Sequence, residues 1–125
     1  DYLLTIKIPY NVNVAALVAV RESLKDIDYL LDRVKAILVE RERLFTELKK
    51  LKWLKPFPSR TNFIFCSVLD GKASELQQKL QNKGILVRYF DQPLLKDAIR
   101  ISVGKPEHTD VLIKALREIG EGRDV

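Results

Sequence analysis

The chain has only one cysteine and few glycines and prolines, five of each in 125 residues. A single cysteine excludes a disulfide framework within the chain, so a reducing compartment fits it. Cys66 follows Phe63, Ile64 and Phe65 and precedes Val68. That setting favours a small buried hydrophobic residue over a nucleophile.

Long hydrophobic runs are also missing, although 46% of the residues are hydrophobic. Charged residues interrupt every apolar run well before the length that would span a bilayer, and no apolar segment follows a basic amino terminus. The sequence therefore predicts neither membrane insertion nor secretion. Its length and composition fit one compact domain over residues 1–125.

The basic residues of the sequence do not form a continuous stripe, although the formal net charge is +5. Lysines and arginines alternate with acids, as in Glu40-Arg41-Glu42-Arg43, which is typical of a solvated face. The strand-like segments carry no aromatic motif of the kind that stacks bases. A nucleic-acid partner is therefore not expected.

A helical section is expected over residues 1–51. No glycine or proline occurs between Asn13 and Lys50, and apolar residues recur there at helical spacing. Capping residues around Ser23 to Asp28 predict a break, which gives helices at about residues 14–24 and 27–51. Trp53 and the Pro56-Phe57-Pro58 segment end this section.

An α/β section is expected over residues 61–119. Strands are predicted at residues 63–68, 85–89 and 98–103, and helices at 73–83 and from 106 onward, with Gly84 closing the first of these helices. Residues 111, 112, 115, 116 and 119 are assigned to the buried face of the last helix. The order is helix, helix, strand, helix, strand, strand, helix, which is an α+β fold with helices packed on a small sheet.

Two of the predicted strands each contain one arginine, Arg88 and Arg100. A guanidinium stays charged and offers a planar fork of donors, so two of them on neighbouring strands would bind phosphate or carboxylate. Alternation places Arg100 and Ser102 on the face opposite Ile99 and Ile101. The residues leave an alternative open, in which each arginine caps a strand end or pairs with a surface acid.

Other chemical motifs are weaker. Tyr10, Asn11 and Asn13 offer donors and acceptors just before the first helix, where helix capping would also explain them. His108 has no cysteine or histidine nearby, so no metal site is expected. The sequence contains no glycine-rich phosphate loop and no catalytic triad, and from its chemistry alone it lacks a nucleophile and a base.

Five segments, taken together and in order, resemble the carboxyl-terminal part of histidinol-phosphate aminotransferases, and they span nearly the whole chain. They are Pro9-Tyr10-Asn11-Val12-Asn13, Thr61-Asn62-Phe63-Ile64, Gly84-Ile85-Leu86-Val87-Arg88, Ile99-Arg100-Ile101-Ser102-Val103-Gly104 and Pro106-Glu107. The stretch from Val103 to Asp110 resembles the plant or cyanobacterial branch of that family.

The resemblance implies the small carboxyl-terminal domain of a fold-type I enzyme that depends on pyridoxal 5'-phosphate (PLP). It assigns Arg88 and Arg100 to the phosphate of histidinol phosphate, with glutamate and 2-oxoglutarate as the other substrate pair. It also implies that Tyr10, Asn11 and Asn13 line the active site near the interface of a homodimer. The implied location is the cytoplasm, or the plastid stroma for a plant protein.

In this family the lysine that binds the cofactor lies upstream of the matching region, and no lysine here stands in that motif. No catalytic residue and no covalently bound cofactor are therefore expected in this chain, which should be inactive alone. Two alternatives stay open: a non-catalytic anion-binding or assembly domain, and a related aminotransferase of different specificity. The long helices are expected to expose an apolar surface to a missing domain.

Overall fold

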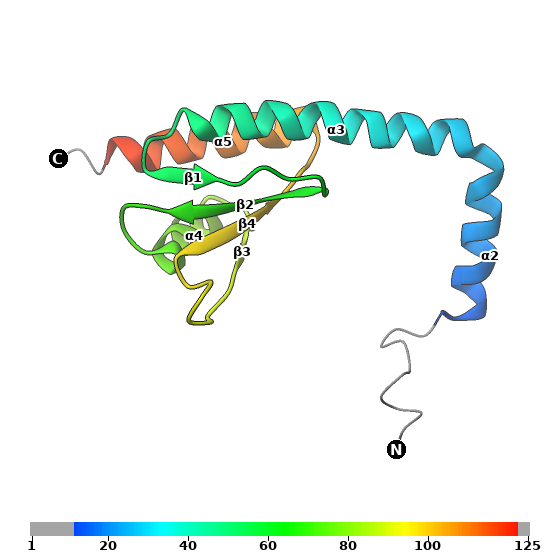
Figure 1. Cartoon of the computed structure of the whole chain (residues 1–125), viewed down its shortest axis with the longest axis horizontal. Helices are drawn as coiled ribbons and strands as arrows, with labels where there is room; N and C mark the ends of the chain where they lie inside the picture. Colours follow the sequence, from blue (N-terminus) through cyan, green and yellow to red (C-terminus); the bar gives the residue numbers. More distant parts are fainter. Residues whose placement is uncertain (1–11, 123–125) are drawn as a thin grey trace, which may run out of the picture. The chain divides into compact units, whose positions relative to one another are not determined.

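The computed structural model describes residues 12–122. Contacts divide the chain after Val34 into two compact units, which we describe separately. The division falls within a long helix, α3 (Ile27–Lys49), which is labelled in Figure 1. Whether residues 1–125 form a single domain stays a prediction.

The described part of the first unit, residues 12–34, is largely helical, as expected. It contains α2 (Val14–Ser23), one turn of 3-10 helix, η1 (Leu24–Asp26), and the start of α3. Asn13 is the N-cap of α2, and its Oδ1 accepts a hydrogen bond from the backbone N–H of Ala16 at 2.8 Å, which supplies a partner to one of the free donors at the helix start. The predicted break after Leu24 is confirmed as η1.

The second unit contains a four-stranded antiparallel sheet in the order β1-β2-β4-β3. Its strands are β1 (Leu54–Pro56), β2 (Phe63–Val68), β3 (Arg88–Tyr89) and β4 (Ala98–Ser102). The sequence prediction missed β1, because Pro56 was taken only as the end of the helical section. A proline is tolerated here since β1 lies at the edge of the sheet.

The helix α4 (Ala73–Asn82) has Lys83 as its C-cap, and Gly84 closes it as predicted. Gly84 has a φ of +77°, its N–H bonds to the carbonyl of Gln81, and the N–H of Ile85 bonds to that of Leu80. This is a Schellman cap, which needs the left-handed backbone that glycine adopts freely. The cap uses the N–H of Ile85, and β3 is correspondingly shorter than the predicted strand at 85–89.

One face of the sheet packs against α4, the second half of α3, and α5 (Pro106–Glu121). Pro106 opens α5 as predicted, but Val111 is 57% exposed, so its assignment to the buried face was wrong. The buried stripe of α5 is centred between Leu112 and Leu116, and Val111 lies beyond its edge. The core comprises Leu44, Leu48, Leu54, Ile64, Cys66, Val68, Ala73, Leu76, Leu80, Ile99, Ile101, Leu112, Ile113, Ala115, Leu116 and Ile119.

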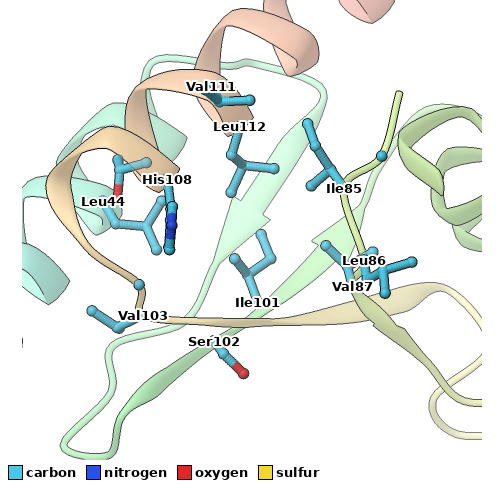
Figure 2. Close-up of a pocket in the computed structure, with 13 residues that line it drawn as sticks. Leu44, Ile85, Leu86, Val87, Ile101, Ser102, Val103, His108, Val111 and Leu112 are labelled. Atoms are coloured by element: carbon cyan, nitrogen blue, oxygen red, sulfur yellow. The ribbon is translucent and has the colours of Figure 1, made fainter. Parts of the chain in front are cut away.

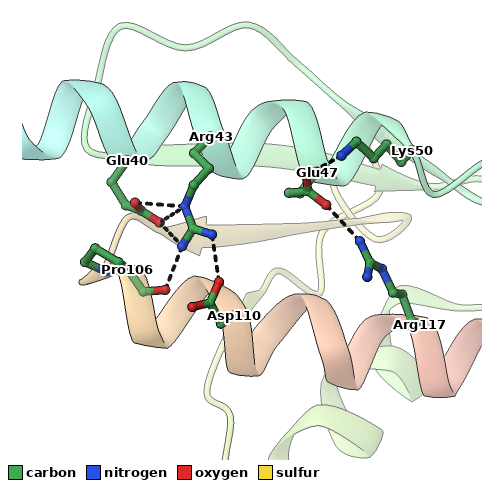
Figure 3. Close-up of polar contacts among 7 residues, drawn as sticks. All are labelled: Glu40, Arg43, Glu47, Lys50, Pro106, Asp110 and Arg117. Carbon is green, nitrogen blue, oxygen red and sulfur yellow. Dashed lines mark hydrogen bonds and ion pairs between the residues drawn. The ribbon is translucent and has the colours of Figure 1, made fainter.

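Arg43 links α3 to the start of α5 (Figure 3). Its guanidinium donates to both carboxylate oxygens of Glu40, at 2.8 and 3.1 Å, to Oδ1 of Asp110 at 2.7 Å and to the carbonyl of Pro106 at 2.7 Å. Farther along, Arg117 of α5 donates to Glu47 of α3 at 2.8 Å. These contacts hold the two helices side by side.

Glu40 is only 5% exposed, which is unusual for a carboxylate. Burial alone would raise its pKa, but hydrogen bonds from Arg43 and Thr109 hold the pKa below its ordinary value. Thr109 is itself buried at the start of α5. The charged carboxylate of Glu40 therefore stabilises the packing of α3 against α5.

The helices also carry exposed apolar side chains, as the sequence predicted. In the first unit these are Val14, Leu17, Val18, Val20, Leu24, Ile27, Tyr29, Leu31 and Val34, with Val12 just before α2; in the second unit α3 adds Ile37, Leu38 and Val39. Among the described residues, no helix is long and apolar enough to cross a membrane. Exposed apolar area of this kind marks an interaction surface.

The pKa of Glu40 makes the stability of the chain depend on pH. Because that pKa is lowered by folding, its stabilisation is complete above the unfolded value of about 4.5 and is lost as the pH falls through the folded value. We expect Glu40→Gln to lower the free energy of unfolding by about 1–3 kcal/mol at pH 7, with less difference from wild type at pH 3. Urea unfolding at both pH values measures this.

Glu42→Gln is the matched control, since Glu42 is exposed and pairs with Arg41 on the same helix. It should change the free energy of unfolding by less than about 0.5 kcal/mol. A loss on Glu40→Gln that is the same at pH 7 and pH 3 would contradict the role of the charge.

The exposed apolar side chains predict that the isolated chain self-associates as its concentration rises. Leu17→Asp should shift sedimentation equilibrium toward monomer, because it places a charge within the apolar set. Leu94→Asp is the control, since Leu94 is 97% exposed but lies outside that set. A wild-type chain that stays monomeric throughout would count against this expectation.

Candidate anion-binding site

The strand register brings Arg88 and Arg100 directly opposite each other on β3 and β4. Residues opposite each other on antiparallel strands project from the same face. Phe65 of β2 lies opposite Arg100 on its other side. The buried residues Ile64, Ile99 and Ile101 occupy the other face, against the helices. The two arginines therefore share the face of the sheet that the helices of this unit leave uncovered.

Aromatic rings surround the guanidinium groups. The Cζ of Arg100 lies 5.1 Å from the ring centroid of Phe63 and 5.8 Å from that of Phe90, and the Cζ of Arg88 lies 5.3 Å from the Phe90 centroid. These distances are within the range of cation–π attraction. Arg100 is half-buried, whereas Arg88 is exposed, so only Arg100 is partly enclosed as the sequence suggested.

Neither arginine has an acidic partner among residues 12–122. Arg41, Arg43 and Arg117 all pair with glutamates on the helical side of the fold. In contrast, the Nε of Arg100 is buried without a hydrogen-bond partner. A buried donor without a partner costs stability unless a ligand supplies an acceptor. Within the described chain, a surface ion pair does not explain these arginines.

Two like charges opposite each other on neighbouring strands repel. An anion with several acceptor oxygens would relieve that repulsion and satisfy the free donor of Arg100. Phosphate and carboxylate are the groups that match a guanidinium fork. The arrangement can hold an anion, but it contains no group placed to do covalent chemistry on one.

The sequence reasoning missed the aromatic part of this site. Arg88 and Phe90 are two residues apart in an extended segment, so their side chains project to the same side. That spacing could have predicted the contact between Arg88 and Phe90 from the sequence. The contact between Phe63 and Arg100 depended on the β2–β4 register, which spacing alone could not supply.

A separate pocket of about 400 Å³ lies on the helical side of the sheet (Figure 2). Leu112, Ile101 and Ile85 point into it, whereas the Ser102 hydroxyl points away. His108 lines the pocket, and its Nδ1 accepts from the backbone N–H of Lys105 at 3.4 Å. No arginine or lysine lines this pocket, so it is distinct from the anion site.

The expected roles of Tyr10, Asn11 and Asn13 in the active site stay predictions. Asn13 caps α2, which agrees with its simpler interpretation, and it belongs to the first unit. Tyr10 and Asn11 lie outside the described residues. Cys66 is buried, and burial raises the pKa of its thiol to about 12, so it is a core residue as predicted. No group of histidine, cysteine and acidic residues in the described ranges could hold a metal ion.

Known proteins resemble this chain over nearly its whole length. It is 56% identical over 121 residues to a histidinol-phosphate aminotransferase of Dehalococcoides mccartyi, covering 97% of this chain and 34% of that protein. It is 45% identical over 119 residues to the chloroplastic histidinol-phosphate aminotransferase 1 of Arabidopsis thaliana, covering 94% and 28%. The chain thus spans about a third of the length of the curated relatives it matches.

A solved structure agrees with the sequence matches. The histidinol-phosphate aminotransferase of Sinorhizobium meliloti, determined in complex with pyridoxal 5'-phosphate, has a TM-score of 0.77 at 26% identity, with 97% of this chain and 33% of that chain covered. The α+β fold is thus that of a fragment of a fold-type I aminotransferase. The family model described as aminotransferase class I and II matches residues 1–116. This chain belongs to the class I and II aminotransferase family.

Proposed function

We propose that the chain is the carboxyl-terminal small domain of a histidinol-phosphate aminotransferase. Such an enzyme converts glutamate and imidazole-acetol phosphate into 2-oxoglutarate and histidinol phosphate. The names of the relatives support this class of reaction. The observation that carries the assignment to this chain is the pair formed by Arg88 and Arg100, which face each other with no acidic partner among residues 12–122.

The two arginines are proposed to bind the phosphate group of the substrate. Each guanidinium can donate two parallel hydrogen bonds, so together they would orient a dianion and fix the far end of the substrate. Arg100 is also proposed to receive a carboxylate of glutamate, because the enzyme must accept two different amino donors in turn. Its partly buried guanidinium, with a free Nε, suits that role.

We propose that the described part of this chain does not hold PLP by itself. Lys50 and Lys83 pair with glutamates, Lys55 lies over the ring of Phe57, and the apolar pocket has no lysine in its lining. The S. meliloti relative holds PLP within a chain about three times as long as the matched part. We therefore propose that the rest of the protein binds the cofactor and that this chain alone is inactive.

The whole enzyme is proposed to be a homodimer, with Tyr10, Asn11 and Asn13 near the active site and the interface. Asn13 precedes α2, whose side chains at Leu17 and Val18 are exposed. An apolar helix surface next to that segment is consistent with contact to another domain or subunit.

Steady-state kinetics of the full-length protein test the arginine roles. We expect Arg88→Ala and Arg100→Ala each to raise the KM for histidinol phosphate by about 10- to 100-fold, the loss of a charge-assisted hydrogen bond. Arg88→Ala should affect glutamate much less. Arg117→Ala is the control, because Arg117 pairs with Glu47 on the helical side. Unchanged kinetics in both variants would refute the assignment.

The same measurements test a related aminotransferase of different specificity. A histidinol-phosphate enzyme should prefer histidinol phosphate over unphosphorylated histidinol, and that preference should collapse in Arg88→Ala. An enzyme that prefers an unphosphorylated amino acid would support the alternative.

The second candidate function is a non-catalytic anion-binding module. It is favoured by one observation: both arginines lie in this chain and need no other domain to face each other. Titrating the isolated chain with phenyl phosphate should shift the NMR signals of the Arg88 and Arg100 Nε–H groups saturably. Arg117 should not respond. If the signals do not move, the chain does not bind the anion by itself, and the module hypothesis fails.

A further inference from the structure

We propose that Phe90 is a positioning residue that holds the guanidinium groups of Arg88 and Arg100 in the orientation that binds one anion. This inference rests on the proposed function, since it concerns the same pair of arginines. Phe90 contacts no substrate in this account and acts only through the two arginines.

The first argument is geometric. Phe90 follows β3 directly, so its ring is on the same side of the extended chain as Arg88. The ring centroid lies 5.3 Å from the Cζ of Arg88 and 5.8 Å from the Cζ of Arg100. The ring of one residue is therefore shared by two cations on neighbouring strands.

The second argument is electrostatic. The face of an aromatic ring carries partial negative charge, and its attraction to a cation is strongest away from bulk water. Phe90 is half-buried. A shared ring offsets part of the repulsion between the arginines when no anion is bound. It does so without a carboxylate, which would compete with the substrate phosphate for the same donors.

The third argument concerns the freedom of the side chains. An arginine side chain loses rotamer entropy when it binds an anion, and prior ordering reduces that loss. Phe63 provides a second ring for Arg100, at 5.1 Å, whereas among the described residues Arg88 lies over the ring of Phe90 alone. Arg88 is the more exposed of the two. Loss of the Phe90 ring should therefore disturb Arg88 most.

The test uses the full-length protein and inorganic phosphate, whose dissociation constant is measured by calorimetry. Phe90→Leu keeps apolar bulk but removes the ring, and we expect phosphate to bind about five- to tenfold more weakly. Phe90→Tyr keeps the ring and should bind within about twofold of wild type. Phe57→Leu is the matched control, because Phe57 directly follows β1 and its ring lies under the ammonium of Lys55, whereas Arg88 and Arg100 lie over the rings of Phe90 and Phe63.

A second measurement separates electrostatics from packing, and it applies even if Phe90→Leu fails to fold. Stepwise fluorination of the Phe90 ring reduces the partial negative charge on the face of the ring, and it changes the size of the ring little. Phosphate affinity should fall at each step, and the Arg88 Nε–H signal should broaden or shift with it. Thermal unfolding midpoints should stay nearly constant across the series.

The outcomes distinguish this inference from the proposed function. Weaker phosphate binding in Arg88→Ala, in Phe90→Leu and along the fluorinated series, with Phe90→Tyr retained, supports both. Weaker binding in Arg88→Ala with a flat fluorinated series overturns the role of Phe90 and leaves the phosphate site standing. Unchanged binding in both Arg88→Ala and Arg100→Ala overturns the phosphate site, and the role of Phe90 with it.

Discussion

Two guanidinium groups face each other across β3 and β4 with no acid of the described chain between them. Such a pair is unfavourable in isolation, because like charges on opposed strand positions repel. The structure tolerates the pair at the outer face of the sheet, where solvent and aromatic rings reduce the cost. An anion would turn the same arrangement into a favourable one. The helices of this unit leave the arginine face of the sheet uncovered.

The helices leave it open by packing together on the other face. Arg43 fixes α3 to the start of α5 through Glu40, Asp110 and the Pro106 carbonyl. Arginines on that side are satisfied by acids, in charge-assisted contacts that stabilise the fold. The contrast between Arg43 and Arg100 is therefore one of partners: the guanidinium of Arg43 binds acids within the fold, whereas the Nε of Arg100 has no partner in the described chain.

Much of this fold follows from short-range signals in the sequence. The 3.6-residue period predicted α3 and α5, the Gly84 cap ended α4 where it was expected, and alternation separated Arg100 from Ile99 and Ile101. The edge strand β1 was missed because its proline masks a three-residue strand whose pairing depends on β2. Periodicity alone could not place Val111, since one step around a helix separates a buried position from an exposed one.

The anion site was predictable only in part, because some of its features are local in sequence and others depend on strand pairing. The arginines stand within apolar runs, which is a local signal, but their direct opposition depends on the β3–β4 register. The rings of Phe63 and Phe90 become part of the site only when three strands are assembled. Family resemblance supplied the proposed identity of the anion, whereas the strand register supplied the reason that these two residues could bind one.

The most direct test is a crystal structure of the full-length protein with histidinol phosphate bound. The account predicts that oxygens of the substrate phosphate accept hydrogen bonds from both Arg88 and Arg100, including the Nε of Arg100. It would be contradicted by a phosphate bound elsewhere, with both guanidinium groups paired to carboxylates from the rest of the protein.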